Sequence, residues 1–329
     1  MKKIKQIGVL TSGGDSPGMN AAIRAVTRAA ILNDLSVVGI MAGYHGLITN
    51  DFIPLTAQSV RGIIQTGGTI LRAARSPEFK TDEGLETAYK NLKDAHIDAL
   101  VVIGGDGTLR GANDFFKRFD VPIVGIPGTI DNDIYGTDYT VGYDTCLNTI
   151  VGAVDKIRDT ASSHNRIFFV EVMGRESGFV AMNSGLACGA DLILIPEQSN
   201  QIEKTRIFLS ERARQNKSSV IMVAEGIKEG TNMVVDTMKK EFPQFDIRVS
   251  VLGYIQRGGS PSARDRILAS EMGVEAINAL LKGEKGIMIG RVHGQTHYES
   301  FTSAIRTYKK ADSEFLRIAE SIGTYTPTD

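Results

Sequence analysis

The sequence has very little cysteine and no tryptophan. Its two cysteines, Cys146 and Cys188, are too few for a disulfide framework and lack the spacing of a metal site. A reducing compartment is therefore expected. No apolar stretch reaches membrane-spanning length, and the N-terminal apolar run stops at Thr11, too early for a signal peptide. These absences predict a cytoplasmic protein.

An excess of charge of either sign is also missing. The chain carries 37 basic and 38 acidic residues, a formal net charge of −1. This balance gives no support to binding of nucleic acid or a membrane surface, so an anion site must come from local groups of arginines. A hydrophobic content of 42% is that of a globular protein, and 329 residues predict about two domains.

The most informative segment begins with an unbroken apolar run, Ala99–Ile103, which predicts a strand buried on both faces of a parallel sheet. Gly104-Gly105-Asp106-Gly107 follows, and a helix is expected from about Thr108. Glycine N–H groups and a helix N-terminus form a site for phosphate. Asp106 would repel a polyphosphate there unless it holds Mg²⁺, which bridges phosphate oxygens.

A second apolar strand, Pro122–Ile126, leads into a loop that contains Asp131 and Asp133. Both loops leave the carboxyl edge of the sheet, where ligands bind. The sequence therefore predicts one crevice that contains Asp106 as a Mg²⁺ ligand and Asp131 and Asp133 as candidate general bases. Two other interpretations are open for the separate loops. Gly105-x-Gly107-x-x-x-Gly111 is a loose dinucleotide fingerprint, and the two acids suit a simple turn. The two loops together favour phosphoryl transfer.

The chain begins with a similar strand and glycine loop. Ile4–Leu10 is the expected strand, and Gly14 is the expected point of closest backbone approach to a phosphate. Ser16 and Pro17 predict the N-cap and first turn of a helix that continues through Met19–Asn33. In the same way, Ser260 and Pro261 predict the start of a long helix that ends near Leu281.

Strands alternate with helices along most of the chain, which predicts an α/β fold. Residues 51–76 are expected to be rich in loops, and the boundary between two α/β layers is placed near Val141–Tyr143. Further short apolar strands are expected at Val37–Ile40, Ile167–Val172, Leu192–Ile195, Val220–Ala224, Val249–Leu252 and Ile287–Ile289.

Four arginines in the second half lie beside predicted strand ends or glycine turns: Arg166, Arg175, Arg248 and Arg257. A guanidinium binds phosphate through two parallel hydrogen bonds, so several that converge would bind a phosphorylated small molecule. For each arginine alone, a surface ion pair is the alternative. Glu225 follows a buried strand and could accept hydrogen bonds from sugar hydroxyls.

In order, the segments GVLTSGGDSPGMNAAIR, GGTILRAARSPEF, VVIGGDGT, GIPGTIDNDIYGTDYTVGYDT, VEVMGR and VLGYIQRGGSP closely resemble those of the bacterial ATP-dependent 6-phosphofructokinases. The resemblance extends from about Ile4 to Arg291. It implies two Rossmann-like, three-layer α/β domains with parallel central sheets and an active site in the cleft between them. Residues 1–142 plus about 256–306 would bind ATP, and residues 143–255 plus about 307–329 would bind the sugar phosphate.

The implied activity is transfer of a phosphoryl group from ATP to the 1-hydroxyl of D-fructose 6-phosphate. The products are fructose 1,6-bisphosphate and ADP, in the committed step of glycolysis. The resemblance also implies a homotetramer whose sugar-phosphate site is completed by a neighbouring subunit. Kinases of NAD or lipids share the GGDGT loop but lack PGTIDND and QRGGSP, and a non-catalytic sensor would not need Asp106, Asp131 and Arg175 together.

The resemblance also implies roles for individual residues. Asp131 would be the general base, and Thr129 and Arg175 would stabilise the transferring phosphoryl group. Asp106 would hold Mg²⁺. The residues implied for ATP are Gly14, Arg75, Ser76, Gly105, Asp106, Gly107 and Thr108. Those implied for the sugar phosphate are Thr129, Ile130, Asp131, Met173, Gly174, Arg175, Glu225, Tyr254 and Arg257, with Arg166 and Arg248 lent by the neighbouring subunit.

Some positions decide specificity or depart from the family's pattern. Pyrophosphate-using relatives carry aspartate at the position of Gly107 and lysine at that of Gly128, so ATP is the expected donor. Tyr254 stands where histidine is common in the family, so a lower affinity for the 6-phosphate of the sugar is expected. The implied site for the effectors ADP and phosphoenolpyruvate comprises Arg24, Arg28, Arg158, Gly189, Asp191, Arg214 and Lys217. Asp191 replaces the usual glutamate there, and the 215–218 segment lacks the usual basic run.

Overall fold

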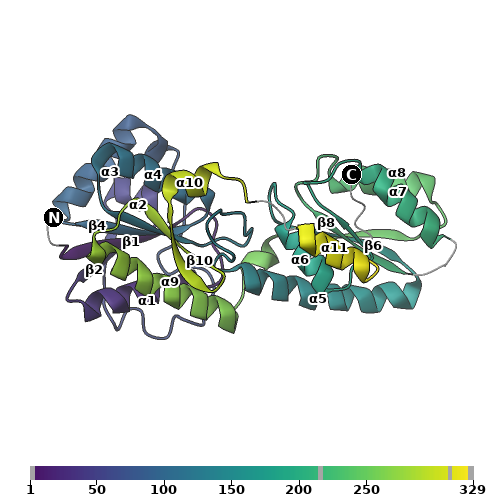
Figure 1. The fold of residues 1–329 in the computed structure, drawn as a ribbon, viewed down its shortest axis with the longest axis horizontal. Coiled ribbons are helices and arrows are strands. Elements are labelled where there is room, and N and C mark those ends of the chain that lie inside the picture. Colours follow the sequence, from purple (N-terminus) through teal and green to yellow (C-terminus); the bar gives the residue numbers. More distant parts are fainter. Residues whose placement is uncertain (1–3, 214–217, 310–312, 325–329) are drawn as a thin grey trace. The chain divides into compact units, whose positions relative to one another are not determined.

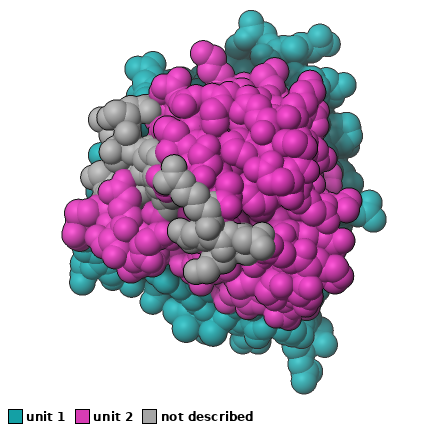
Figure 2. Space-filling view, turned by 90° about the vertical axis from the view of Figure 1, so that its right-hand side faces the viewer, with its two compact units in different colours: residues 1–130, 134–145, 257–309 teal, residues 131–133, 146–256, 310–329 magenta. Residues whose placement is uncertain are grey.

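The structure is a computed structural model that describes residues 4–213, 218–309 and 313–324. The chain divides into two compact units, coloured separately in Figure 2. The first consists of residues 1–130, 134–145 and 257–309, and the second of residues 131–133, 146–256 and 310–329. The short piece Asp131–Asp133 thus groups with the second unit, which the expected boundaries did not include. No helix among the described residues is long and apolar enough to span a membrane.

The first unit is built on a seven-stranded sheet in the order β11-β10-β5-β4-β1-β2-β3. Its five central strands are parallel, whereas β3 and β11 pair antiparallel at the two edges. The parallel centre confirms the predicted fold class; the antiparallel edges were not predicted. The strands are β1 (Gln6–Ser12), β2 (Ser36–Ile40), β3 (Phe52–Leu55), β4 (Ala99–Gly104), β5 (Ile123–Pro127), β10 (Ile287–Val292) and β11 (Gln295–Ser300).

Helices cover both faces of this sheet (Figure 1). Alternate residues of β4 show why two layers form, because Val101 and Ile103 pack into one core and Leu100 and Val102 into the other. The first core is closed by α1 (Met19–Leu32) and α9 (Ala263–Lys282). The second is closed by α2 (Tyr44–Thr49), α3 (Asp82–Asp94), α4 (Asp106–Phe119) and α10 (Phe301–Arg306), with the short 3₁₀ helix η1 (Glu78–Lys80) beside them.

The second unit has a four-stranded, entirely parallel sheet in the order β7-β8-β6-β9. Most residues of β6, β7 and β8 are apolar and buried, as expected for strands with helices on both faces, whereas β9 is partly exposed. The strands are β6 (Ile167–Val172), β7 (Leu192–Leu194), β8 (Ser219–Ala224) and β9 (Ile247–Val251). The helices are α5 (Tyr143–His164), α6 (Phe179–Ala187), α7 (Gln201–Arg212), α8 (Thr231–Glu241) and α11 (Ser313–Ser321), and the 3₁₀ helix η2 (Gly253–Arg257) leads back to the first unit.

Both serine N-caps predicted from the sequence were wrong. Helix α1 is preceded by Gly18 at φ 105°, and the Ser16 hydroxyl instead donates to the carbonyl of Val141 at 2.9 Å. Helix α9 is capped by Ser262, which accepts the N–H of Asp265, while Ser260 bonds to the carbonyl of Gln65. In both cases the serine hydroxyl donates a hydrogen bond to a carbonyl distant in sequence and does not cap the helix that the local pattern predicted.

Candidate active site

Three neighbouring strands of the first unit end side by side and bring the predicted loops together. Ser12 at the end of β1 pairs with Gly104 at the end of β4, and Gly104 pairs with Pro127 at the end of β5. The loops that contain Gly14, Asp106 and Thr129 therefore leave the sheet along one carboxyl edge, where open α/β sheets bind ligands. The sequence predicted this juxtaposition.

The first two loops interlock through Thr108. Its hydroxyl donates to the carbonyl of Ser12 at 3.0 Å, and its carbonyl accepts the hydroxyl of Tyr44 at 2.6 Å. A Cβ on Gly104 would lie 2.3 Å from the Thr108 hydroxyl oxygen and 2.5 Å from the Ser12 carbonyl oxygen. Gly104 is therefore required for close packing of β4 against β1.

We expect Gly104→Ala to lower the free energy of unfolding by about 1–3 kcal/mol, because the added methyl group meets backbone that cannot move aside. Gly107→Ala is the matched control, since an added Cβ there meets nothing within 4 Å and helix α4 favours alanine over glycine. Urea unfolding of both variants measures the difference. Equal stability of the two variants would contradict the packing argument.

Asp106 lies in the first turn of α4, with N-cap Gly105 before it, so the helix begins two residues earlier than predicted. The side chain is 32% exposed, and its Oδ2 accepts the Nε–H of Arg110 at 2.7 Å. This hydrogen bond raises the pKa of Arg110. An accessible carboxylate at a helix N-terminus fits a Mg²⁺ ion that is held partly by nucleotide phosphates. Within the described part of the chain, no three His, Cys, Asp or Glu side chains gather to hold a metal by themselves.

The guanidinium of Arg257 lies directly against Gly14. A Cβ on Gly14 would lie 1.8 Å from Arg257 Nη1, and the buried Nε of Arg257 has no hydrogen-bond partner among the described residues. The first unit thus brings a residue predicted for ATP next to one predicted for the 6-phosphate. Of the remaining residues predicted for ATP, Arg75 is exposed, and Ser76 accepts the N–H of Phe79 at 3.3 Å.

In the second unit, Asp131 forms an ion pair with Arg175. Arg175 Nε lies 3.3 Å from Asp131 Oδ2, and the Asp131 side chain is only 3% exposed whereas that of Arg175 is 48% exposed. The hydroxyl of Ser177 also donates to the Asp131 carbonyl, at 3.4 Å. A nearly buried carboxylate beside a guanidinium suits a base that acts where negative charge develops.

The loop that carries Arg175 is held by two side chains that accept hydrogen bonds from its backbone N–H groups. Arg175 has φ 52° and follows Gly174 at φ 142°, so two consecutive residues adopt positive φ. Glu225 Oε1 accepts the Arg175 N–H at 2.9 Å, and Gln256 Oε1 accepts the Met173 N–H at 3.1 Å. Glu225, predicted to contact the sugar, thus orients the Arg175 loop in this structure.

Arg166 and Arg248 are brought together by the carboxylate of Asp246, which is not among the predicted site residues. Asp246 Oδ2 lies 2.6 Å from Arg166 Nε, and its Oδ1 lies 2.7 Å from Arg248 Nε. The hydrogen bond from Arg166, and then that from Arg248, lowers the pKa of Asp246. Tyr254, which was predicted to bind the same phosphate, is 82% exposed.

The residues predicted for an effector are divided between the units. Arg24 and Arg28 lie on α1, whereas Arg158 donates to the carbonyls of Cys188 and Gly189 in the second unit. Asp191 Oδ1 pairs with Arg212, and its Oδ2 accepts the Val220 N–H at 2.9 Å. Both carboxylate oxygens of Asp191 are therefore engaged by the fold. Arg214 and Lys217 lie outside the described residues.

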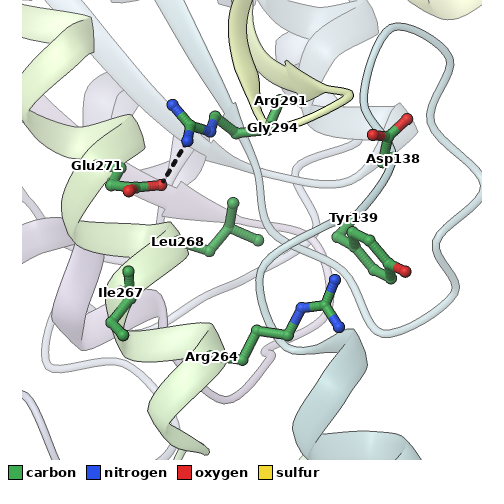
Figure 3. A pocket seen from close by; sticks show the side chains of 8 residues that line it. All are labelled: Asp138, Tyr139, Arg264, Ile267, Leu268, Glu271, Arg291 and Gly294. Carbon is green, nitrogen blue, oxygen red and sulfur yellow. Dashed lines mark ion pairs between the residues drawn. The ribbon is translucent and has the colours of Figure 1, made fainter.

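The first unit also contains a pocket of about 440 Å³ that includes none of the predicted site residues (Figure 3). Its acids are already bonded, because Glu271 pairs with Arg291 at 3.4 Å and Asp138 accepts the His293 N–H at 2.7 Å. The lining residues are Asp138, Tyr139, Arg264, Ile267, Leu268, Glu271, Arg291 and Gly294.

Comparison with known proteins decides between the kinase families. Residues 6–280 match the model of the family described as phosphofructokinase. The chain is 53% identical to ATP-dependent 6-phosphofructokinase 2 of Bacteroides thetaiotaomicron over 324 residues, 98% of this chain and 99% of that protein. It is 49% identical to ATP-dependent 6-phosphofructokinase 1 of Thermus thermophilus over 318 residues, which is 96% of this chain and 99% of the relative.

The chain belongs to the phosphofructokinase family.

The fold agrees with a solved member of the family. The structure of phosphofructokinase from Saccharomyces cerevisiae superposes with a TM-score of 0.86 at 36% identity, covering 97% of this chain and 46% of the yeast chain. The match of residues 6–280 includes every residue predicted for ATP, metal, base and sugar phosphate. All of these predicted residues of the phosphofructokinase therefore lie in the part of the chain that matches the family model.

Proposed function

We propose that this phosphofructokinase transfers the γ-phosphoryl group of ATP to the 1-hydroxyl of fructose 6-phosphate, forming fructose 1,6-bisphosphate and ADP. The observation that supports this most directly is the pair of Asp131 and Arg175, in which a nearly buried carboxylate lies 3.3 Å from a guanidinium. Both substrates are metabolites of the cytoplasm, where we expect the enzyme to act.

The reaction assigns a distinct task to each group. Asp131 accepts the proton of the 1-hydroxyl, which leaves that oxygen able to attack the γ-phosphorus. Arg175 and Thr129 donate hydrogen bonds to the phosphoryl oxygens as negative charge spreads over them. The backbone N–H groups of the loops at Gly14 and Gly105 bind the other phosphates of the nucleotide.

Asp106 is the residue that would hold Mg²⁺, since it is the accessible carboxylate at the N-terminus of α4. The bound ion would neutralise charge on the β- and γ-phosphates. Arg110, which pairs with Asp106, keeps that carboxylate directed across the first turn of the helix.

The space around Gly107 supports ATP as the donor. Nothing lies within 4 Å of the position that a Cβ would take, so the glycine leaves the site open to the remainder of a nucleoside triphosphate. Gly128 is different, because a Cβ there would lie 3.2 Å from Ile103 and 3.3 Å from Met19. We therefore assign donor selection chiefly to Gly107.

The division of the chain supports separate tasks for the units. We assign nucleotide binding to the first unit, which holds the glycine loops, and sugar-phosphate binding to the second, which holds Asp131, Arg175 and the pair Arg166 and Arg248. By resemblance to the family, the latter two arginines would serve a neighbouring subunit of a homotetramer. ADP and phosphoenolpyruvate are the proposed effectors, at a site where Asp191 is already bonded to Arg212.

A coupled assay of the purified chain with fructose 6-phosphate tests the proposal. We expect rapid turnover with MgATP and little with pyrophosphate, and phosphorus NMR of the product should show phosphate at carbon 1. NAD and diacylglycerol serve as alternative acceptors, because other kinases share the GGDGT loop. Phosphorylation of either, without turnover of fructose 6-phosphate, would overturn the assignment.

A further inference from the structure

One buried carboxylate of the first unit has no part in the chemistry described above. Asp265 is 1% exposed and accepts three hydrogen bonds, from the N–H of Gly142 at 2.9 Å, the N–H of Thr145 at 2.8 Å and the hydroxyl of Thr145 at 2.5 Å. Burial raises the pKa of this carboxyl group, and the hydrogen bonds from Thr145 and Gly142 oppose that shift. All three partners are donors, which suits the ionised form.

These bonds join the beginnings of two helices. Asp265 lies in the first turn of α9, and Thr145 lies in the first turn of α5. In return, the Ser262 hydroxyl donates to Asp144 at 2.6 Å, and the Ser262 N–H donates to the Thr145 hydroxyl at 2.9 Å. Two helix N-termini that face each other repel through their partial positive charges, and the carboxylates of Asp144 and Asp265 offset that repulsion.

The segment fixed by Asp265 closes the loop that begins at Gly128. Val141 forms a bridge with Gly128, its N–H donates to the Pro127 carbonyl at 2.9 Å, and its carbonyl accepts the hydroxyl of Ser16. The Thr140 hydroxyl donates to the carbonyl of Thr129 at 2.6 Å. The segment therefore touches both the first glycine loop and the residue proposed to contact the phosphoryl group.

Helix α9 also contacts this segment on the side seen in Figure 3. The guanidinium of Arg264 lies 3.7 Å from the ring centroid of Tyr139. Residues 139–145 are thus held by two consecutive side chains of α9, one by stacking and one by hydrogen bonds.

We propose that Asp265 is a positioning residue for phosphoryl transfer: by fixing Gly142 and Thr145, it holds the loop of Thr129 in register with the loop of Ser16. This rests on the proposed function. A displacement of a reacting group by about 1 Å can lower a rate about a hundredfold. Loss of the Asp265 hydrogen bonds is therefore expected to lower kcat and to leave the KM values nearly unchanged.

The test compares Asp265→Asn with Asp98→Asn. Asp98 anchors backbone in the same way, accepting the N–H groups of Lys5 and Gln6 at 2.9 and 3.2 Å, but at the opposite end of β1. Both variants are assayed well below their unfolding temperatures. We expect Asp265→Asn to lower kcat by about 10- to 100-fold with KM values within about twofold of wild type, and Asp98→Asn to leave kcat unchanged.

Hydrogen exchange supplies a readout that needs no substrate. We expect Asp265→Asn to speed exchange of the amides in residues 13–18 and 127–145 relative to the rest of the first unit. If the variant does not fold, Thr145→Val keeps the side-chain shape and removes the two hydrogen bonds of the hydroxyl, one donated to Asp265 and one accepted from the Ser262 N–H. Two backbone N–H groups still donate to Asp265 in this variant, so its effects on kcat and on exchange are expected to be smaller than those of Asp265→Asn.

An unchanged kcat in a folded Asp265 or Thr145 variant would overturn the proposal, as would equal losses for Asp98→Asn. If the wild-type chain fails to phosphorylate fructose 6-phosphate, the proposed function falls separately. In that case, the hydrogen-exchange comparison alone tests whether Asp265 holds the two loops. A uniform change in exchange across the first unit would refute that role for Asp265.

Discussion

Asp131→Asn is expected to lower kcat with fructose 6-phosphate and MgATP by about 10²- to 10⁴-fold, because the amide cannot accept the proton of the 1-hydroxyl in the transition state. Asparagine has nearly the shape of aspartate, so the nearly buried site remains filled. Arg175, which is 48% exposed, keeps access to water when its partner loses its charge. The effect should therefore appear in turnover, measured by release of ADP in a coupled assay.

The control for this variant is Asp133→Asn, two residues along the same segment. Asp133 is less buried than Asp131, and its variant should retain most of the wild-type kcat. Circular dichroism of both variants checks that they fold. A kcat for Asp131→Asn within a few-fold of the wild type would remove Asp131 as the base, whatever the value for Asp133→Asn.

Gly107→Asp is expected to lower kcat/KM for ATP by about a hundredfold or more. The new carboxylate would lie in the first turn of α4, where it repels the phosphates of the nucleotide at a cost of several kcal/mol. The protein itself should accept it, because a Cβ at this position meets no atom within 4 Å and acidic residues suit the first turn of a helix. Initial rates at varied ATP concentration provide the measurement.

The control for this prediction is Gly107→Ala, which adds the Cβ without the charge. We expect this variant to use ATP much better than Gly107→Asp does, with unfolding temperatures close to each other. Unchanged ATP kinetics in Gly107→Asp would show that residue 107 does not face the nucleotide. An equal loss in both variants would instead assign the effect to backbone rigidity rather than to charge.

The parallel strands and their loops could be predicted because their signals are local. Ala99–Ile103 is uninterrupted by polar residues, and the glycines and acid follow within the next four positions. The edge strands could not be found in this way. Strand β11 has the sequence QTHYES, whose mostly polar side chains carry no hydrophobic pattern, and β3 is only four residues long.

The residues that organise the site were missed for a different reason. Asp265 follows Ser262 in an S-x-x-D pattern that indicates a local helix cap, yet its main partners, Gly142 and Thr145, are 123 and 120 residues away. Asp246 precedes an unremarkable strand, and nothing nearby indicates that Arg166 pairs with it across 80 residues. Ser16 was assigned to the wrong partner because Val141 is equally remote. A single sequence contains no signal for such pairings.

The interleaved path of the chain has a consequence for its synthesis. The four strands of the second unit end at Val251, whereas the sheet of the first unit still lacks β10 and β11, which begin at Ile287 and Gln295. Helix α9, which covers α1 and much of one core, is also made late. As the polypeptide leaves the ribosome, the sheet that begins first is therefore completed after the other sheet, and β5 remains an unpaired edge strand until β10 has been made.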